Sequence, residues 1–195
     1  MKVYGDRGSG NCLKVKYTAD HLGLAYTWID VDIMNGESRT PAFLARNPQG
    51  QVPVLERDDG RCLAQSNAII RYLARGSALL PDDPFAQAKV DEWLFWEQYS
   101  HEPFIAVCRF QMVYLKCGKQ DREPQRVERG EAALDLMESM LGRNRWLAGD
   151  GMTVADIALL AYTRLAHEGG FDMAPREHIR GWIGRCESAL GLPGV

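Results

Sequence analysis

Ser66 stands where a helix is expected to begin, directly after a predicted hairpin. Gln65-Ser66-Asn67 precede apolar side chains at helical spacing, namely Ile69, Tyr72 and Leu73. The first backbone N–H groups of a helix lack intrahelical partners, and the helix dipole is positive at that end. The Ser66 hydroxyl and these N–H groups therefore form a suitable site for an anion such as a carboxylate.

A second set of potential ligand contacts is the backbone of Val52, which precedes Pro53. Proline cannot donate to a sheet ladder, so it belongs at the start or edge of a strand. An X-Pro bond adopts the cis form at a cost of only about 0.5–1 kcal/mol. We expect a cis Val52–Pro53 bond that turns the Val52 N–H and C=O away from the sheet and leaves them available to a ligand.

The elements that must position these groups form an α/β domain over residues 1–76. Turn signals at Asn47–Gly50 and at Asp58-Asp59-Gly60 separate the short β-rich runs. The periodicities predict the order βαβαββα, which is that of a thioredoxin-like domain. The predicted strands are Lys2–Gly5, Tyr26–Asp32, Val52–Leu55 and Cys62–Ala64, and the helices begin near Cys12, Thr40 and Ser66.

The rest of the chain has a helical pattern throughout. Residues 77–84 are punctuated by proline and aspartate and are expected to be a linker, and residues 85–195 an all-helical domain. Pro103 falls inside an aromatic-rich helical stretch and predicts a kink or break there. Thr153 and Asp156 have the spacing of a capping box, so a helix is expected to begin at this point.

Composition and charge exclude several classes of partner. The net charge of −3, with 25% charged residues, gives no reason to expect nucleic acid or a membrane surface as a partner. No run of 18 apolar residues occurs, so no membrane span is expected. Five cysteines without zinc-type spacing favour reduced thiols, a cytoplasmic location and the absence of a bound metal.

Three motifs together resemble the glutathione transferase family, specifically bacterial serine-type members of the theta-, phi- and nu-like kind. They are NPQGQVPVL at 47–55, QSNAI at 65–69, and WLAGD followed by TVAD at 146–156. The resemblance covers nearly the whole chain. It implies a thioredoxin-like domain followed by an all-helical domain, glutathione as a substrate, a homodimer and a role in detoxification.

The resemblance also implies the site residues. Ser9, at the mouth of the first helix, corresponds to the family's catalytic serine, and Asn11 is expected to donate its amide to the sulfur. The residues expected to bind glutathione are Arg39, Gln51, Val52, Pro53, Gln65 and Ser66. Structural alternatives stay open: Ser9 as a simple N-cap, Asn11 as an Asx-turn residue and Arg39 as a solvated charge.

The chemistry expected of Ser9 is the stabilisation of a thiolate. A free thiol of this kind has a pKa of about 8.5, and only its thiolate is a good nucleophile. Lowering that pKa by about 2 units requires roughly 2.7 kcal/mol of preferential stabilisation of the thiolate. A hydroxyl donor at a helix N-terminus supplies this through charge-assisted hydrogen bonding.

Cys12 occupies the last position of a Ser9-Gly10-Asn11-Cys12 segment, where thioredoxin relatives carry C-x-x-C. With serine first, no internal disulfide can form. A packing role is expected of a lone cysteine that faces inward. Catalysis through a mixed disulfide with glutathione is the alternative.

A pocket for an electrophile is expected between the domains, along an aromatic stripe at helical spacing. Its predicted lining residues are Tyr99, Phe104, Cys108 and Met112. The predicted activity is conjugation of the glutathione thiolate to small hydrophobic electrophiles. Two alternatives stay open: glutathione-dependent reduction of disulfides or peroxides on the same fold, and a non-catalytic module that binds glutathione or a protein partner.

Overall fold

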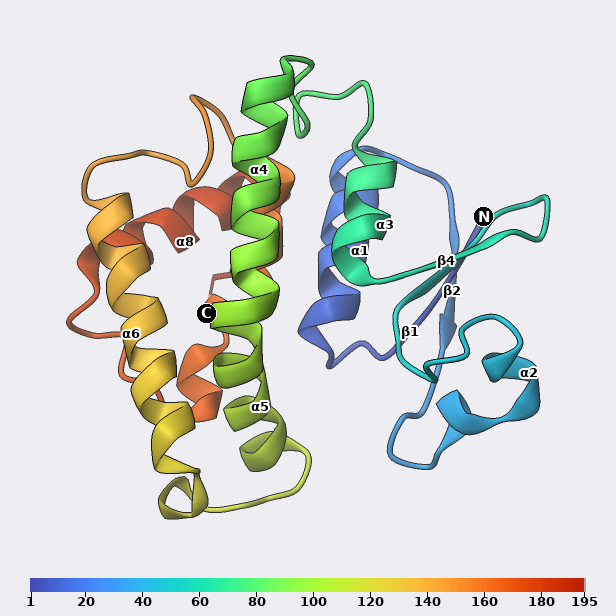
Figure 1. Ribbon diagram of the computed structural model, residues 1–195, viewed down its shortest axis with the longest axis horizontal. Coiled ribbons are helices and arrows are strands. Elements are labelled where there is room, and N and C mark those ends of the chain that lie inside the picture. The colour runs from blue at the N-terminus through green and yellow to red at the C-terminus, as the bar shows by residue number, and fades with distance from the viewer. Residues whose placement is uncertain (195) are drawn as a thin grey trace. The chain divides into compact units, whose positions relative to one another are not determined.

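The computed structural model describes residues 1–194, which divide into two compact units (Figure 1). The first unit is Met1–Arg75 and the second begins at Gly76. The first contains a mixed sheet with helices and the second is helical, so the predicted fold classes are confirmed.

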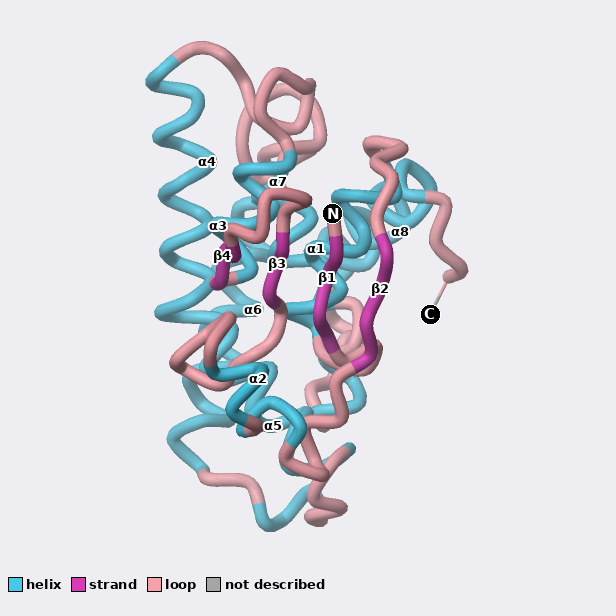
Figure 2. Tube along the Cα trace, turned by 90° about the vertical axis from the view of Figure 1, so that its right-hand side faces the viewer, coloured by secondary structure: helices cyan, strands magenta, loops and turns pink. Residues whose placement is uncertain are grey.

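The sheet of the first unit has four short strands in the order β2-β1-β3-β4 (Figure 2). These are β1 (Lys2–Gly5), β2 (Thr27–Asp30), β3 (Val54–Glu56) and β4 (Cys62–Ala64). β1 is parallel to β2 and antiparallel to β3, and β3 is antiparallel to β4. Gly60, with φ +81°, allows the tight turn between β3 and β4.

Helices cover both faces of this sheet. α1 (Gly10–His21) and α3 (Ser66–Leu73) pack against each other on one face, and α2 (Pro41–Leu44) lies on the other (Figures 1 and 2). α2 begins as the sequence predicts, with Pro41 in its first turn and the Thr40 hydroxyl accepting from the Phe43 N–H. The result is the predicted order βαβαββα.

The second unit has five main helices among the residues that the structure describes. They are α4 (Pro84–Trp96), α5 (Glu102–Val113), α6 (Pro124–Leu141), α7 (Val154–Thr163) and α8 (Glu177–Leu190). Every residue of α7 is buried, so this helix is the centre of the core. None of the helices within residues 1–194 combines the length and apolarity needed to cross a membrane.

α7 begins with the predicted capping box. The Thr153 hydroxyl accepts from the Ala155 N–H, and the Asp156 carboxylate accepts from the Thr153 N–H at 2.9 Å. The same carboxylate accepts from the Leu147 N–H at 3.0 Å and the Trp182 Nε1–H at 2.9 Å. Asp156 therefore joins the preceding loop, α7 and α8.

The sequence predicts a kink or break at Pro103, and the structure has a widened turn there through which the helix continues. A π-helical segment, η2 (Glu97–His101), connects α4 to α5, with Pro103 at the start of α5. Proline cannot donate to a carbonyl four residues back, and its ring crowds that carbonyl. The wider turn accommodates this residue without ending the helix.

The segment predicted as a linker packs onto the helical unit. Leu79 and Leu80 are buried, and the Leu79 carbonyl accepts from the Val154 N–H at 2.9 Å. Leu79, within the predicted linker 77–84, is therefore anchored at the start of α7, and Pro84 already belongs to α4.

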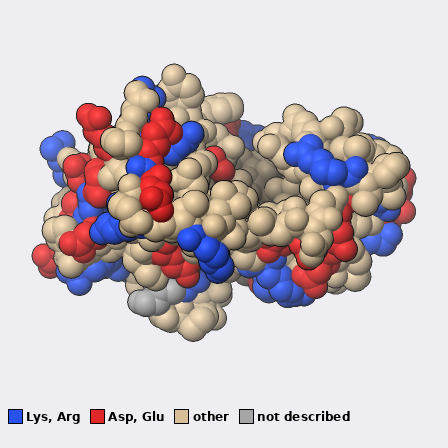
Figure 3. Space-filling model, turned by 90° about the horizontal axis from the view of Figure 1, so that it is seen from below, with Lys and Arg blue, Asp and Glu red and all other residues tan. Residues whose placement is uncertain are grey.

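Acidic and basic side chains lie among one another on the surface shown in Figure 3. This distribution agrees with the small net charge of −3. Neither sign of charge dominates this face.

Candidate active site

The N-terminal turns of α1 and α3 are joined by a hydrogen bond between two predicted site residues. The Ser66 hydroxyl donates to Asn11 Oδ1 at 3.0 Å. Ser66 is buried, with 5% of its surface exposed, and Asn11 is half-buried. Two residues 55 positions apart, one expected to bind a carboxylate and the other a sulfur, therefore lie in contact.

Ser9 occupies the N-cap position of α1, but its hydroxyl does not cap the helix. The residue has an extended backbone, and its side chain accepts no hydrogen bond from the first turn. The side chain is half-buried and hydrogen-bonds to the Cys12 thiol. The sequence also allows Ser9 to be a simple N-cap, but its hydroxyl does not have that role in this structure.

Cys12 lies on α1, and its thiol is buried in the core of the first unit. Burial raises its pKa to about 12, against the smaller opposing effects of hydrogen bonds to Ser9 and to the Asp6 backbone. A thiol with this pKa is protonated at neutral pH and is a poor nucleophile. The geometry favours the packing role for Cys12.

Val52 and Pro53 lie at the entry to β3. Their peptide bond is cis, Pro53 is buried and Val52 is half-buried. β3 begins only at Val54, which pairs with Tyr4. The Val52 backbone therefore lies outside the paired register of the sheet, where the sequence predicts a ligand contact.

The loop before Val52 is held by the buried amide of Asn47. Its Nδ2 donates to the Gln51 carbonyl at 2.7 Å, and its Oδ1 accepts from the Gln49 N–H at 3.1 Å. Gly50 in the same loop has φ +63°, a conformation that favours glycine. These contacts fix the backbone of Gln51, whose side chain is exposed.

Arg39 and Gln65 both bind Gln49, a residue that the sequence analysis did not select. Arg39 Nη1 donates to the Gln49 carbonyl at 2.9 Å, and Gln65 Nε2 donates to Gln49 Oε1 at 2.9 Å. Arg39 is therefore an anchored side chain, although it is exposed. No sequence signal distinguishes Gln49 as the bridge, because the bridge depends on segments that are brought together only by folding.

Gln65 has an unusual backbone conformation for a residue with a side chain. Its φ is +71° and its ψ is +112°, immediately before α3. Such conformations cost about 1–3 kcal/mol and concentrate at binding and catalytic sites. The backbone conformation of Gln65 is therefore an observation, independent of the motif, that is typical of binding sites.

Lys14 is another residue of this region that the sequence analysis missed. It lies on α1, is fully buried, and its Nζ is 3.4 Å from Ser66 Oγ. A lysine is rarely buried in this way. The sequence offered one signal for Lys14: it follows Asn11 by three residues on the same helix, so the two side chains share one helix face.

The four residues predicted to line an electrophile pocket differ widely in exposure. Tyr99 is 83% exposed and Cys108 is fully buried, whereas Phe104 and Met112 are half-buried. Cys108 cannot contact a ligand without repacking of the core. Tyr99 instead continues an exposed row along α4 that includes Phe85 and Phe95.

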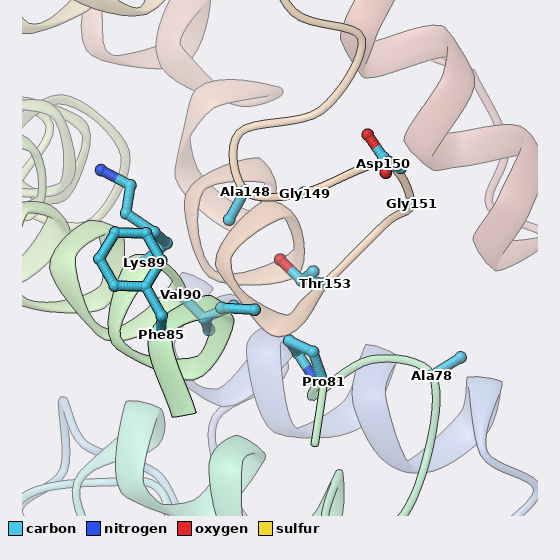
Figure 4. A pocket seen from close by; sticks show the side chains of 11 residues that line it. Ala78, Pro81, Phe85, Lys89, Val90, Ala148, Gly149, Asp150, Gly151 and Thr153 are labelled. Atoms are coloured by element: carbon cyan, nitrogen blue, oxygen red, sulfur yellow. The ribbon is translucent and has the colours of Figure 1, made fainter. Parts of the chain in front are cut away.

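A cavity of about 400 Å³ lies elsewhere in the helical unit (Figure 4). Phe85, Lys89 and Val90 of α4 line one side, and the loop Ala148–Gly151 lines the other. It contains none of the four residues predicted for the electrophile.

Comparison with known proteins gives the same family for both units. Residues 1–75 match the family model for the N-terminal domain of glutathione S-transferase, and residues 120–185 match that for its C-terminal domain. Glutathione S-transferase 3 of Zea mays is 35% identical, with 93% of this chain and 86% of that protein covered. GstB of Escherichia coli K12 is 27% identical, with coverages of 93% and 90%.

Solved structures agree with these matches. A glutathione S-transferase from Pseudomonas fluorescens Pf-5 is 50% identical with a TM-score of 0.93, covering 96% of this chain and 94% of that one. A second, from Xanthobacter autotrophicus Py2, is 41% identical with a TM-score of 0.92, covering 100% and 94%. The chain therefore belongs to the glutathione S-transferase family of enzymes.

Proposed function

We propose that this protein binds glutathione on its first unit and conjugates the glutathione thiolate to small hydrophobic electrophiles. The observation that carries the proposal is the Ser66–Asn11 hydrogen bond at the mouth of α1, beside a Ser9 hydroxyl that caps no backbone N–H. Through this hydrogen bond, Ser66, which would bind a carboxylate, contacts Asn11, which would donate to a sulfur anion.

Glutathione would be held along the edge formed by the loop before β3 and the start of α3. Ser66 and the N–H groups of α3 would bind the γ-glutamyl carboxylate, and Gln65 the nearby ammonium group. The Val52 backbone, at the buried Pro53, would pair with the cysteinyl amide. Arg39 and Gln51 would face the glycyl carboxylate.

The catalytic step needs donors that favour the thiolate over the thiol. Ser9 would donate its hydroxyl hydrogen to the sulfur at the positive end of the α1 dipole. Asn11 Oδ1 accepts from Ser66 at 3.0 Å, and the Asn11 amide would be the second donor to the sulfur. The thiol proton leaves to solvent, the thiolate forms a C–S bond, and the leaving group departs with its electron pair.

The helical unit would supply the apolar surface for the electrophile. Phe104 and Met112 are half-buried and keep exposed surface, which suits an apolar ligand. Tyr99 and Cys108, also predicted for this role, suit it less, because one lies on an open helix face and the other inside the core.

The exposed row on α4 supports a homodimer. Phe85 and Phe95 are 74% and 76% exposed, and they share one helix face with Ala88 and Glu92. Solvent exposure of several aromatic side chains on one face is characteristic of an interaction surface. We assign this row to contact with a second copy of the chain.

A cytoplasmic location and a role in detoxification follow from the same proposal. All five cysteines are free thiols, which suits a reducing compartment. Conjugation to glutathione makes apolar electrophiles soluble and unreactive.

The proposal is tested by conjugation of glutathione to an aryl halide by wild type and Ser9→Ala. Removing a donor that favours the thiolate by roughly 2.7 kcal/mol should lower the rate by up to about 100-fold at neutral pH. Equal rates for the two proteins would exclude Ser9 as the thiolate donor. Binding of glutathione by a wild type without turnover of any electrophile or disulfide would favour a non-catalytic module.

Glutathione-dependent reduction is the second candidate function. Tyr4, the tyrosine nearest to this site in sequence, is buried and donates to Glu56 at 2.9 Å, so it does not supply an acid for conjugation. In reduction the glutathione thiolate would attack one sulfur of a disulfide, and the other sulfur would leave as a thiolate and take up a proton. A second glutathione thiolate would then attack the mixed disulfide, releasing the second thiol and glutathione disulfide. Faster turnover of hydroxyethyl disulfide than of the aryl halide would support this reading.

A further inference from the structure

Lys14 is a cation in an unexpected place. It lies on α1 with none of its surface exposed, and its Nζ is 3.4 Å from both Ser66 Oγ and Asn67 Oδ1. Both partners belong to the first turn of α3. The ammonium group therefore sits against the N-terminal end of that helix.

This placement opposes the electrostatics of α3 alone. The N-terminus of a helix carries partial positive charge, so a cation there is unfavourable, and burial of an ammonium adds a desolvation cost. An apolar side chain would suit a fully buried position of α1, as Val15 and Ala19 do. The combined positive charge instead favours an anion at the same end.

We propose that Lys14 is a positioning residue that, through Ser66, supplies buried positive charge to the seat of the γ-glutamyl carboxylate. The proposal rests on the proposed glutathione site and adds a residue to it. A carboxylate oxygen hydrogen-bonded to Ser66 Oγ would lie no more than about 6 Å from Lys14 Nζ.

Lys14 also sets the direction of the Ser66 hydroxyl. The ammonium can only donate, so it occupies a lone pair of Ser66 Oγ and leaves the hydroxyl hydrogen to point elsewhere. In this structure that hydrogen points to Asn11 Oδ1. When glutathione is bound, the same hydrogen is available to its carboxylate.

The test compares two ligands by calorimetry: glutathione, and 4-aminobutyryl-cysteinylglycine, which lacks only the γ-glutamyl α-carboxylate. Lys14→Met should weaken glutathione binding about 10- to 100-fold and change analogue binding by less than about twofold. Lys14→Arg, which keeps the charge, should retain most of the wild-type preference for glutathione over the analogue. Lys16→Met is the matched control, since Lys16 is paired with Asp20 on the same helix.

Two outcomes would overturn the proposal. Equal weakening of both ligands by Lys14→Met would indicate a purely structural role, and no change in either would exclude any role. Failure of the wild type to bind glutathione would instead reject the proposed function, so the two failures are distinguishable.

A measurement on the wild type keeps the proposal testable if Lys14→Met does not fold. Attraction to a buried cation is screened by salt much less than attraction to exposed charges. The preference for glutathione over the analogue should therefore fall by less than about threefold between roughly 0.02 and 0.5 M salt. Loss of the preference at high salt would place its source on the surface and contradict the role of Lys14.

Discussion

Ser66 is a residue of α3 that contacts two residues of α1 at the candidate site. Its hydroxyl donates to Asn11 and accepts from Lys14, and it is the group proposed to bind the carboxylate of glutathione. Ser66→Ala should weaken glutathione binding by roughly 1–3 kcal/mol, as expected for a hydrogen bond to a charged group. Calorimetry measures this, with the exposed Ser188→Ala as control. Unchanged affinity in Ser66→Ala would remove this residue from the site.

Glu56 gives a prediction about pH and stability. Hydrogen bonds from Lys2, Arg46 and Tyr4 lower the pKa of Glu56 to about 2 from its ordinary value of 4.5. Its ionised form therefore stabilises the fold above about pH 4.5, and this contribution is lost as the pH falls toward 2.

Glu56→Gln should lower the free energy of unfolding by roughly 1–2 kcal/mol at pH 7, after allowance for partial exposure. The difference between variant and wild type should shrink as the pH falls from 4.5 to 2. Urea unfolding at several pH values measures the free energy of unfolding of wild type and variant. A difference between the two that does not change with pH would contradict this role of Glu56.

At the residue scale, the motifs predicted which positions form the candidate site, and folding determined which of these residues are in contact. Ser9, Asn11 and Ser66 were identified from turns, helix starts and the family resemblance. Lys14 and Gln49 were not, because a lysine on a helix and a glutamine in a turn are ordinary surface residues by type. Their contacts with α3 and with Arg39 exist only after distant segments meet.

At the element scale, the Asp156 carboxylate joins the loop before α7 to α8. Burial raises its pKa, and hydrogen bonds from Leu147, Thr153 and Trp182 oppose that rise. Asp156→Asn would turn an amide donor toward these donors and leave at least one of them unsatisfied.

We therefore expect Asp156→Asn to lower the free energy of unfolding by about 2–4 kcal/mol. Chemical denaturation followed by tryptophan fluorescence measures this, because Trp182 is a direct partner. Asp150→Asn, on the exposed loop nearby, should change stability by less than about 0.5 kcal/mol. Equal effects of the two variants would contradict the role of the capping box.

Most elements were predictable because their signals are local. Thr40-Pro41, Thr153 with Asp156, and the Asp58–Gly60 turn each determine a boundary from neighbouring residues. The π-helical turn at Glu97–His101 was not, because Pro103 signals a disturbance without determining how the backbone accommodates it. The hydrogen bond that anchors the Leu79 carbonyl depends on Val154 of α7, more than 70 residues away.

At the scale of the whole molecule, the exposed row on α4 predicts association of two copies. Replacing Phe85 and Phe95 together by serine should convert the protein from a dimer to a monomer, measured by light scattering at micromolar concentration. The control is Phe110→Ser, at an aromatic of α5 that is 37% exposed. A wild type that is monomeric, or a double variant that stays dimeric, would contradict this assignment.

The central claim is that the mouth of α1 stabilises the thiolate of bound glutathione through Ser9. Ultraviolet absorbance of the thiolate, followed against pH, measures the pKa of glutathione bound to wild type and to Ser9→Ala. The account predicts a pKa about 2 units below the free value of about 8.5 in wild type, and a return toward 8.5 in the variant. The same pKa in both proteins, or an unshifted pKa in wild type, would contradict it.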